Sequence, residues 1–189
     1  MTRDLVGGHP ALDLVNTVWW RGDPTRRVDR VPDLPAFLAW AARADLGPID
    51  VVPDAADAAN GTIAAIHTLR EHAHAVLAAH ATGAPVPPAP LRELHAAGAQ
   101  AMRRSAPRPA LPLRWERRAA FADEVPDVVA SSLVDLLAHQ DLTHLRVCAD
   151  DDCAWLYLDR SRNHSRRWCS SAECGNRHRV QRFAARRRT

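Results

Sequence analysis

The sequence predicts an α+β protein, in which a mostly helical N-terminal domain with a few strands is followed by a small cysteine-rich finger. Three observations support this prediction. Apolar residues recur at helical spacing over most of the 189-residue chain, its four cysteines all lie in the last quarter, and 47% of the residues are hydrophobic, which is enough to bury a core. We assign residues 1–143 to the N-terminal domain and residues 144–189 to the finger.

The first elements differ in how clearly the sequence defines them. Residues 11–20 mix alternating apolar positions with β-branched and aromatic residues after a Gly-Gly-His-Pro turn, so a strand is expected, although a short helix also fits. Residues 35–46 carry apolar side chains at helical spacing and end at Gly47-Pro48, which predicts a helix.

The middle of the chain predicts two helices separated by prolines. Helical spacing runs from residue 53 to residue 81 and ends at Thr82-Gly83, and Asn60-Gly61 could divide this helix in two. The proline cluster of residues 85–90 predicts a stiff linker. The apolar positions of the next helix are Leu91, Leu94, Ala97 and Met102.

A strand and a further helix are expected before the finger. Leu111, Leu113 and Trp115 alternate in the manner of a strand. Residues 125–137 form an apolar stripe directly after Asp123-Glu124, and acidic residues suit the first turn of a helix. We expect this helix to pack the root of the finger against the N-terminal domain.

The cysteines form two matched pairs, and they are the most informative motif of the chain. Four residues separate Cys148 from Cys153 and Cys169 from Cys174, and fifteen residues lie between the pairs. Four soft thiolates at this spacing can converge on one tetrahedral ion, which predicts one structural Zn²⁺. Four sulfurs are the simplest ligand set. The histidines close enough in sequence to replace one cysteine are His144, His164 and His178.

Two disulfides are the alternative use of these cysteines. Disulfides are typical of oxidising compartments and of small chains that lack a sufficient core. The N-terminus carries no apolar signal region, and no run of residues approaches the length of a membrane span. We therefore expect a cytoplasmic protein that does not cross a membrane and that binds metal through its thiols.

The order of elements around the cysteines indicates the type of finger. Residues 145–147 lead into the first pair, residues 154–159 alternate like a strand, and residues 175–188 predict a helix with Val180 and Phe183 facing inward. This order predicts a treble-clef-like zinc finger with four cysteine ligands, and a zinc ribbon is the second choice.

Charge divides the chain into two unlike parts. Residues 160–189 contain ten arginines and one acidic residue, Glu173, so that with a net charge of +3 for the whole chain this part carries +9 and residues 1–159 carry −6. A positive surface fused to a metal module indicates a polyanion as partner. A solvated basic tail without a partner is the simpler alternative.

Residues at fixed spacing carry a resemblance to a known family. Around the cysteine pairs, residues 155–163, residues 166–169 and Cys174-Gly175-Asn176-Arg177 closely resemble the CGNR-type zinc finger. Residues 7–17 look like the opening of the ABATE domain, which accompanies this finger in a bacterial family of stress-induced transcription regulators. The resemblance implies that the finger binds DNA and that the N-terminal domain has a regulatory or sensing role.

Chemistry suggests roles within the finger. Gly175 permits a close turn or a positive φ without a Cβ clash. Asn176 could brace the knuckle, and Arg177 could reach a phosphate or an acidic partner within the finger. Trp155 and Trp168 are expected to form its small core, since stacking on an unpaired base is the less frequent role.

Arginines are the candidate contacts to duplex DNA. Guanidinium groups bind phosphates in pairs of hydrogen bonds, but phosphate contacts carry no sequence information. A lone finger offers a small interface, so useful affinity would require a homodimer. The candidate residues are Arg160, Arg162, Arg166, Arg167, Arg177, Arg179, Arg182 and Arg186.

A second candidate site lies near the N-terminus. Asp13, Asn16 and Arg21 interrupt an apolar segment next to two tryptophans, and they could bind a small-molecule effector. Equally, Asp13 and Asn16 could cap a turn while the tryptophans fill the core.

An enzyme is not expected. His67, Glu71 and His74 share one face of a predicted helix, but their spacing does not match the His-Glu-x-x-His zinc protease motif, and a solvent-facing polar strip is the simpler interpretation. The chain also has no Gly-x-Ser-x-Gly elbow and no phosphate-binding glycine loop.

Two classes of function remain open. The first is a DNA-binding transcription regulator in which the N-terminal domain senses a stress signal or ligand. The second is an RNA-binding or protein-interaction module whose zinc finger is purely structural. Strand preference and salt dependence of binding distinguish them.

Overall fold

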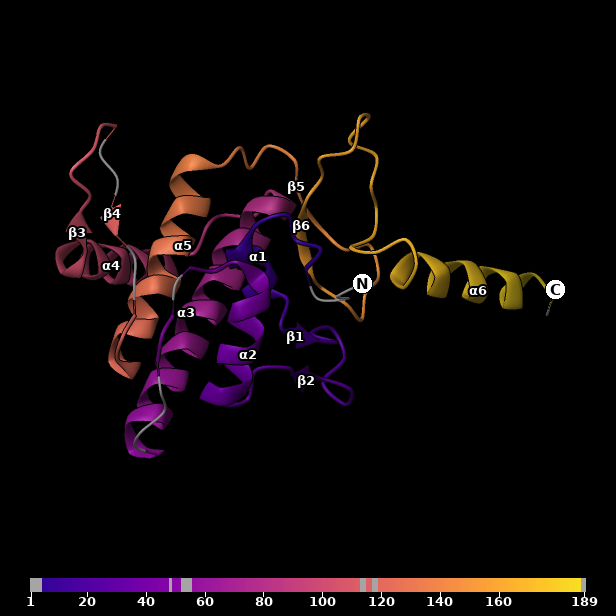
Figure 1. Ribbon diagram of the computed structural model, residues 1–189. Coiled ribbons are helices and arrows are strands. Elements are labelled where there is room, and N and C mark those ends of the chain that lie inside the picture. The colour runs from indigo at the N-terminus through magenta and orange to yellow at the C-terminus, as the bar shows by residue number, and fades with distance from the viewer. Residues whose placement is uncertain (1–4, 48, 52–55, 113–114, 117–118, 188–189) are drawn as a thin grey trace.

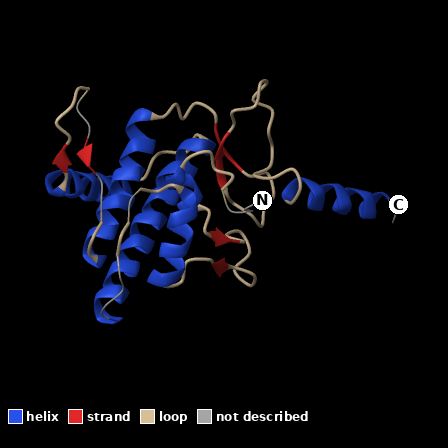
Figure 2. Cartoon of the chain, viewed as in Figure 1, coloured by secondary structure: helices blue, strands red, loops and turns tan. Residues whose placement is uncertain are grey.

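The computed structural model describes residues 5–47, 49–51, 56–112, 115–116 and 119–187. Over these residues, a body of helices carries three small antiparallel strand pairs, and the last helix, α6, extends away from the body (Figure 1). Helix and strand occur in the mixture expected of an α+β protein (Figure 2). None of the described helices is long and apolar enough to cross a lipid bilayer.

Three helices form the centre of the body. They are α3 (Ala56–Thr82), α4 (Pro88–Arg104) and α5 (Val125–His139), and a short 3₁₀ turn, η1 (Ala122–Glu124), leads into α5. Leu133 and Leu136 of α5 and Ile66 and Leu77 of α3 are fully buried in one core. Helices α4 and α5 lie so close that a Cβ on Gly98 would stand 2.4 Å from Cγ2 of Val134, so a larger residue there would force Val134 to shift.

The N-terminal segment folds across this centre. The ambiguous residues 11–20 form both predicted elements in succession, α1 (Pro10–Val15) and then β1 (Val18–Trp19), which pairs with β2 (Val28–Asp29). His9 begins α1 because its Nδ1 accepts a hydrogen bond from the Ala11 amide at 3.2 Å. The predicted helix before Gly47 is α2 (Leu34–Ala44), whose N-cap is Asp33.

Prolines and glycine interrupt the middle of the chain less than expected. Helix α3 continues through Asn60-Gly61, and α4 begins at Pro88, so that half of the expected proline linker lies in the first turn of α4. Proline is tolerated there because the first amides of a helix have no intrahelical acceptor. The predicted apolar positions Leu91 and Met102 are exposed by 43% and 55%.

The strand expected over residues 111–115 is shorter than predicted. Leu111 is 92% exposed and lies outside any strand, and Leu113 lies outside the described residues. Strand β4 (Trp115–Glu116) pairs instead with β3 (Ala106–Pro107), so this pair of strands consists of two residues on each side.

A hairpin of β5 (Leu145–Val147) and β6 (Leu156–Leu158) joins the finger to the body. Alternation along β6 places Leu156 and Leu158 in the core of the body, whereas Trp155 and Tyr157 pack against the cysteines. Strand β5 packs against α3 and β6 packs against α1, so these helices, and not mainly α5 as predicted, support the root of the finger.

The N-terminal segment also holds the finger through hydrogen bonds. The Asn16 amide group donates to the Leu156 carbonyl at 2.8 Å and accepts from the Leu156 amide at 2.9 Å, so it acts like a paired strand residue. The Leu158 amide donates to the Gly7 carbonyl at 2.9 Å. Gly22 approaches the loop of the first cysteine pair so closely that a Cβ would stand 1.9 Å from the Asp151 carbonyl oxygen.

We predict that Asn16→Ala destabilises the protein by about 2–3 kcal/mol, because it leaves two buried backbone groups of Leu156 without their partner. Urea unfolding measures this difference. Asn60→Ala on the exposed surface of α3 is the matched control, with an expected change within about 0.5 kcal/mol. Equal effects of the two substitutions would contradict the role of Asn16.

Candidate metal centre and basic surface

The four cysteines converge on one point. All four sulfur atoms lie within 4.8 Å of one another and all four residues are buried. The Sγ atoms of Cys153 and Cys169 are 3.7 Å apart, and those of Cys169 and Cys174 are 3.5 Å apart. A disulfide requires about 2.05 Å. A tetrahedron with Zn–S bonds of about 2.3 Å has edges of about 3.8 Å, so the cluster fits one zinc ion.

Different elements carry the two cysteine pairs. Cys148 directly follows β5 and Cys153 precedes β6, so the first pair sits in the turn of the hairpin. Cys169 lies in a loop, and Cys174 is the first residue of α6 (Cys174–Arg186). A ligand pair on a knuckle followed by a ligand on the first turn of a helix is the treble-clef-like arrangement that the sequence predicts.

The histidines near the motif have other roles. Among the described residues, the only cluster suited to a metal ion consists of the four cysteines. The rings of His144 and His164 stack on each other with centroids 3.5 Å apart. His178 packs near Trp168, with centroids 5.4 Å apart. The ligand set therefore consists of four sulfurs.

The cluster needs a cation to hold four thiolates together. Hydrogen bonds from Cys153 and Cys169 lower the pKa of the Cys148 thiol, and the hydrogen bond to Cys148 raises the pKa of Cys169, because a hydrogen bond stabilises the sulfur that accepts it as a thiolate and the sulfur that donates it as a thiol. Two donors stabilise negative sulfur: the Cys169 amide lies 3.3 Å from Sγ of Cys148, and the Arg177 guanidinium lies 3.1 Å from Sγ of Cys174. Zinc supplies the missing charge and a fixed tetrahedral geometry, and its role here is structural.

Two of the predicted DNA-binding arginines face inward. Arg177 forms an ion pair with Asp150 at 2.9 Å, in addition to its bond to Cys174. Arg166 lies over the Tyr157 ring at 4.1 Å and donates to the carbonyls of Trp168, Val6 and Cys169. Their guanidinium groups hold the metal loops, a role that the sequence suggested for Arg177 alone.

The remaining six predicted arginines are exposed. They lie on the loop between β6 and Cys169 and along α6, which projects from the body (Figure 1). These residues are Arg160, Arg162, Arg167, Arg179, Arg182 and Arg186. Arg179 donates to the Ser171 carbonyl at 3.2 Å, and Arg167 lies 5.1 Å from the Trp168 ring.

The inward-facing apolar positions predicted for α6 were wrong, and of the two conformations suggested for Gly175 the structure does not have the positive φ. Val180 and Phe183 are exposed by 58% and 62%, because α6 leaves the body after its first turn and has no core to face. Gly175 does not adopt a positive φ, and a Cβ there would stand at an ordinary 3.6 Å from the Ser170 carbonyl and the Trp168 ring. Non-glycine residues near the finger that have a positive φ include Trp20, Ala154 and His164.

The expected small core of the finger draws on the N-terminal segment. Trp155 is buried, and its Nε1 donates to the Val18 carbonyl at 2.9 Å. Trp168 is partly buried against the same cluster. Two guanidinium groups lie over the Trp20 ring, that of Arg26 at 3.6 Å and that of Arg177 at 4.2 Å from its centroid. The sequence does not reveal the contact with Arg177, because more than 150 residues separate it from Trp20.

The three predicted effector-binding residues have partners within the protein. Asp13 accepts a hydrogen bond from the Gly7 amide at 2.7 Å, and Asn16 pairs with Leu156 as described above. Arg21 donates to both carboxylate oxygens of Glu71, at 2.6 and 3.1 Å. The three side chains therefore connect the N-terminal segment to other elements, and their binding of an effector stays a prediction.

The strip of His67, Glu71 and His74 on α3 is engaged in the same way. His67 Nε2 lies 2.8 Å from the Val31 carbonyl, and His74 Nε2 lies 3.4 Å from the Ala154 carbonyl.

The carboxylate of Glu71 is held ionised by two arginines. Burial opposes ionisation of Glu71, but Arg21 and Arg70 outweigh burial and lower the pKa of Glu71 to about 2. These contacts give the strip a structural role between α3, the N-terminal segment and the finger.

We predict that the zinc-loaded protein contains about one zinc ion per chain and that Cys169→Ser loses most of it, because a hydroxyl is a poor substitute for a thiolate. Metal analysis after gel filtration measures the zinc content. Ser165→Ala, in the exposed loop before Cys169, is the control and should retain the metal. A Cys169→Ser protein with the full zinc content would contradict the four-sulfur site.

We predict that His74 makes stability depend on pH. Burial lowers the pKa of His74 from 6.5 to about 4. Between these two pH values the unfolded chain therefore binds a proton at His74 and the folded chain does not. The free energy of unfolding should therefore fall between pH 7 and pH 4, and His74→Gln should remove at most about 3 kcal/mol of this fall. Urea unfolding against pH tests this, with His95→Gln on the exposed face of α4 as control. Parallel pH profiles for His74→Gln and the original protein would contradict the prediction.

Comparison with known proteins agrees with this geometry. Residues 144–187 match the CGNR zinc finger, and residues 8–140 match ABATE, described as "Putative stress-induced transcription regulator". Neither description names an enzyme. None of the curated proteins matches the chain. Since the ABATE model covers more than half of its residues, the chain belongs to the ABATE family and carries a CGNR zinc finger at its C-terminal end.

Proposed function

We propose that this protein is a DNA-binding transcription regulator, in which residues 144–189 contact duplex DNA and residues 1–143 sense a stress signal or ligand. One observation carries the proposal: six exposed arginines cover the loop before Cys169 and the projecting helix α6. The family description supports a regulatory role.

The charge of this surface suits the phosphate backbone. Residues 160–189 carry ten arginines against Glu173, and the inward-facing Arg166 and Arg177 leave most of that charge on the outside. Each phosphate that an arginine neutralises releases a counterion, so affinity should fall steeply with salt. Arg166 and Arg177 contribute indirectly in this proposal, because they hold the loops that present the other arginines.

The shape of α6 limits what one copy can do. A single projecting helix offers a contact area comparable to one small module, of about 600–1,000 Å². We therefore propose that a homodimer places two such helices on neighbouring half-sites. The four thiols, which are free of disulfides, suit a reducing compartment such as the cytoplasm.

A protein-interaction role is the second candidate. Val180 and Phe183 are large apolar side chains exposed on α6, and such residues often mark a surface that another protein covers. In that case, or if the finger prefers RNA, the zinc site would only be structural. Binding of structured or single-stranded RNA in preference to duplex DNA would favour the RNA alternative.

We predict that the double substitution Arg179→Ala and Arg182→Ala weakens DNA binding and lowers the slope of log affinity against log salt by about two, one for each lost phosphate contact. Fluorescence anisotropy with duplex DNA from the protein's own promoter and a scrambled duplex measures both quantities. The matched control is Arg92→Ala with Arg103→Ala, two exposed arginines of α4. An unchanged salt slope in the α6 variant would contradict the proposed surface.

A further inference from the structure

Helix α6 carries two large apolar side chains on its surface. Val180 and Phe183 are exposed by 58% and 62%. They are three residues apart, so they share one face of the helix. We propose that α6 enters the major groove of duplex DNA and that Val180 and Phe183 contact the C5-methyl groups of thymines there. This inference rests on the proposed function, because it names what the same helix recognises on DNA.

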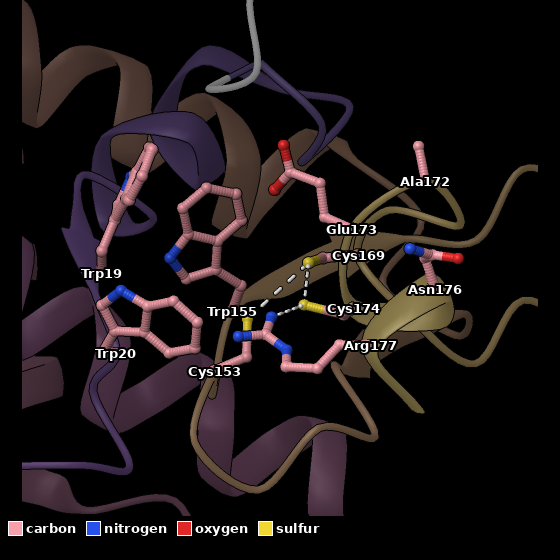
Figure 3. A pocket seen from close by; sticks show the side chains of 10 residues that line it. All are labelled: Trp19, Trp20, Cys153, Trp155, Cys169, Ala172, Glu173, Cys174, Asn176 and Arg177. Carbon is pink, nitrogen blue, oxygen red and sulfur yellow. Dashed lines mark hydrogen bonds between the residues drawn. The ribbon is translucent and has the colours of Figure 1, made fainter. Parts of the chain in front are cut away.

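The root of α6 is anchored at the metal site, which gives the helix a defined direction. Cys174 is its first residue, and the Arg177 guanidinium lies 3.1 Å from Sγ of Cys174 (Figure 3). The same guanidinium lies 4.2 Å from the Trp20 ring centroid, and both residues line one pocket. Beyond this anchor, residues 179–187 are all exposed, and α6 projects from the body (Figure 1). Its outer turns can therefore approach a partner without a change at the metal site.

The dimensions of the helix select the major groove. An α-helix with its side chains is about 10–12 Å across, while the major groove of B-DNA is about 12 Å wide and the minor groove about 6 Å. Helix α6 has 13 residues, so it extends about 20 Å. A helix of this size can lie in the major groove with its outer turns, and it is too wide for the minor groove.

Arginines border the apolar pair on the same face. Arg179 lies four residues before Phe183, and Arg187 lies four residues after it. Arg179 donates to the carbonyl of Ser171, which is neutral and leaves the positive charge in place. The Arg187 guanidinium lies 5.4 Å from the Phe183 ring centroid, close to the outer limit of about 6 Å for such contacts. Positive and apolar side chains thus alternate on one face, as phosphates and base edges do along a groove.

Duplex DNA suits this pair better than a protein partner does. The centre of a protein–protein interface is depleted of charged residues, whereas Val180 and Phe183 lie among arginines. The major groove offers isolated apolar groups between polar base edges, and among the four bases only thymine carries a methyl group there. Phosphate contacts alone confer no sequence preference, so these two side chains would give α6 a preference for A·T pairs.

Replacing thymine with uracil tests the contact, because it removes the methyl group and keeps the base pairs and phosphates. Fluorescence anisotropy compares binding of the zinc-loaded full chain to duplex DNA from its own promoter and to the same duplex with uracil at every thymine. We expect the uracil duplex to bind at least about threefold more weakly, since burial of each methyl group contributes roughly fourfold. Equal affinity for both duplexes would overturn the inference alone, and it would favour a protein partner for the apolar pair. Failure of both duplexes to bind would overturn the proposed function as well.

Substitutions in α6 locate the contact. The double substitution Val180→Ala and Phe183→Ala should bind the thymine and uracil duplexes with equal affinity. Leu91→Ala with Met102→Ala, which shortens two exposed apolar side chains of α4, is the matched control and should keep the preference for thymine. Zinc content and circular dichroism verify that both variants fold. A preference for thymine that persists in the α6 variant would show that uracil acts through the shape of the duplex, and it would overturn the assignment to these residues.

Discussion

The rest of the structure depends on strand β6, which has a core on each of its two faces. Leu156 and Leu158 belong to the core of the helical body, while Trp155 and Tyr157 cover the cysteine cluster. Because side chains alternate along a strand, these four consecutive residues join the core of the finger to the core of the body. Asn16 then pairs with the backbone of Leu156, so the N-terminal segment completes the support of the metal site.

The arginines of the finger differ in role although they share one chemistry. Arg166 and Arg177 satisfy carbonyl, carboxylate and thiolate groups close to the metal, and they hold its loops in place. The arginines of α6 beyond its first turns are exposed on the outer surface of the finger. Arginines near the metal thus stabilise the centre of the finger, and those farther along α6 give its outer surface a positive charge.

Local patterns predicted much of the fold and the metal site. Helices α2 and α5 and strand β6 follow from periodicity, and the two cysteine pairs predict the four-sulfur cluster because their spacing limits where the thiols can go. The same reasoning was wrong for Val180 and Phe183, since a helical apolar stripe shows which residues share a face but not whether anything packs against it. It also placed Pro88 in a linker, whereas Pro88 is the first residue of α4. Proline is tolerated there because the first amides of a helix have no intrahelical acceptor.

By itself, the sequence determined the fold class, the zinc ligands and the division of charge between the two parts of the chain, because these depend on residue type and short spacing. Only the tertiary structure decided which arginines face inward, where α6 points and that Trp19, Trp20 and Glu173 share a pocket. The pocket, the hydrogen bond from Arg166 to Val6 and the stacking of Arg177 on Trp20 each join residues more than a hundred positions apart. Such contacts depend on how the whole chain packs, and they leave no periodic pattern in the sequence.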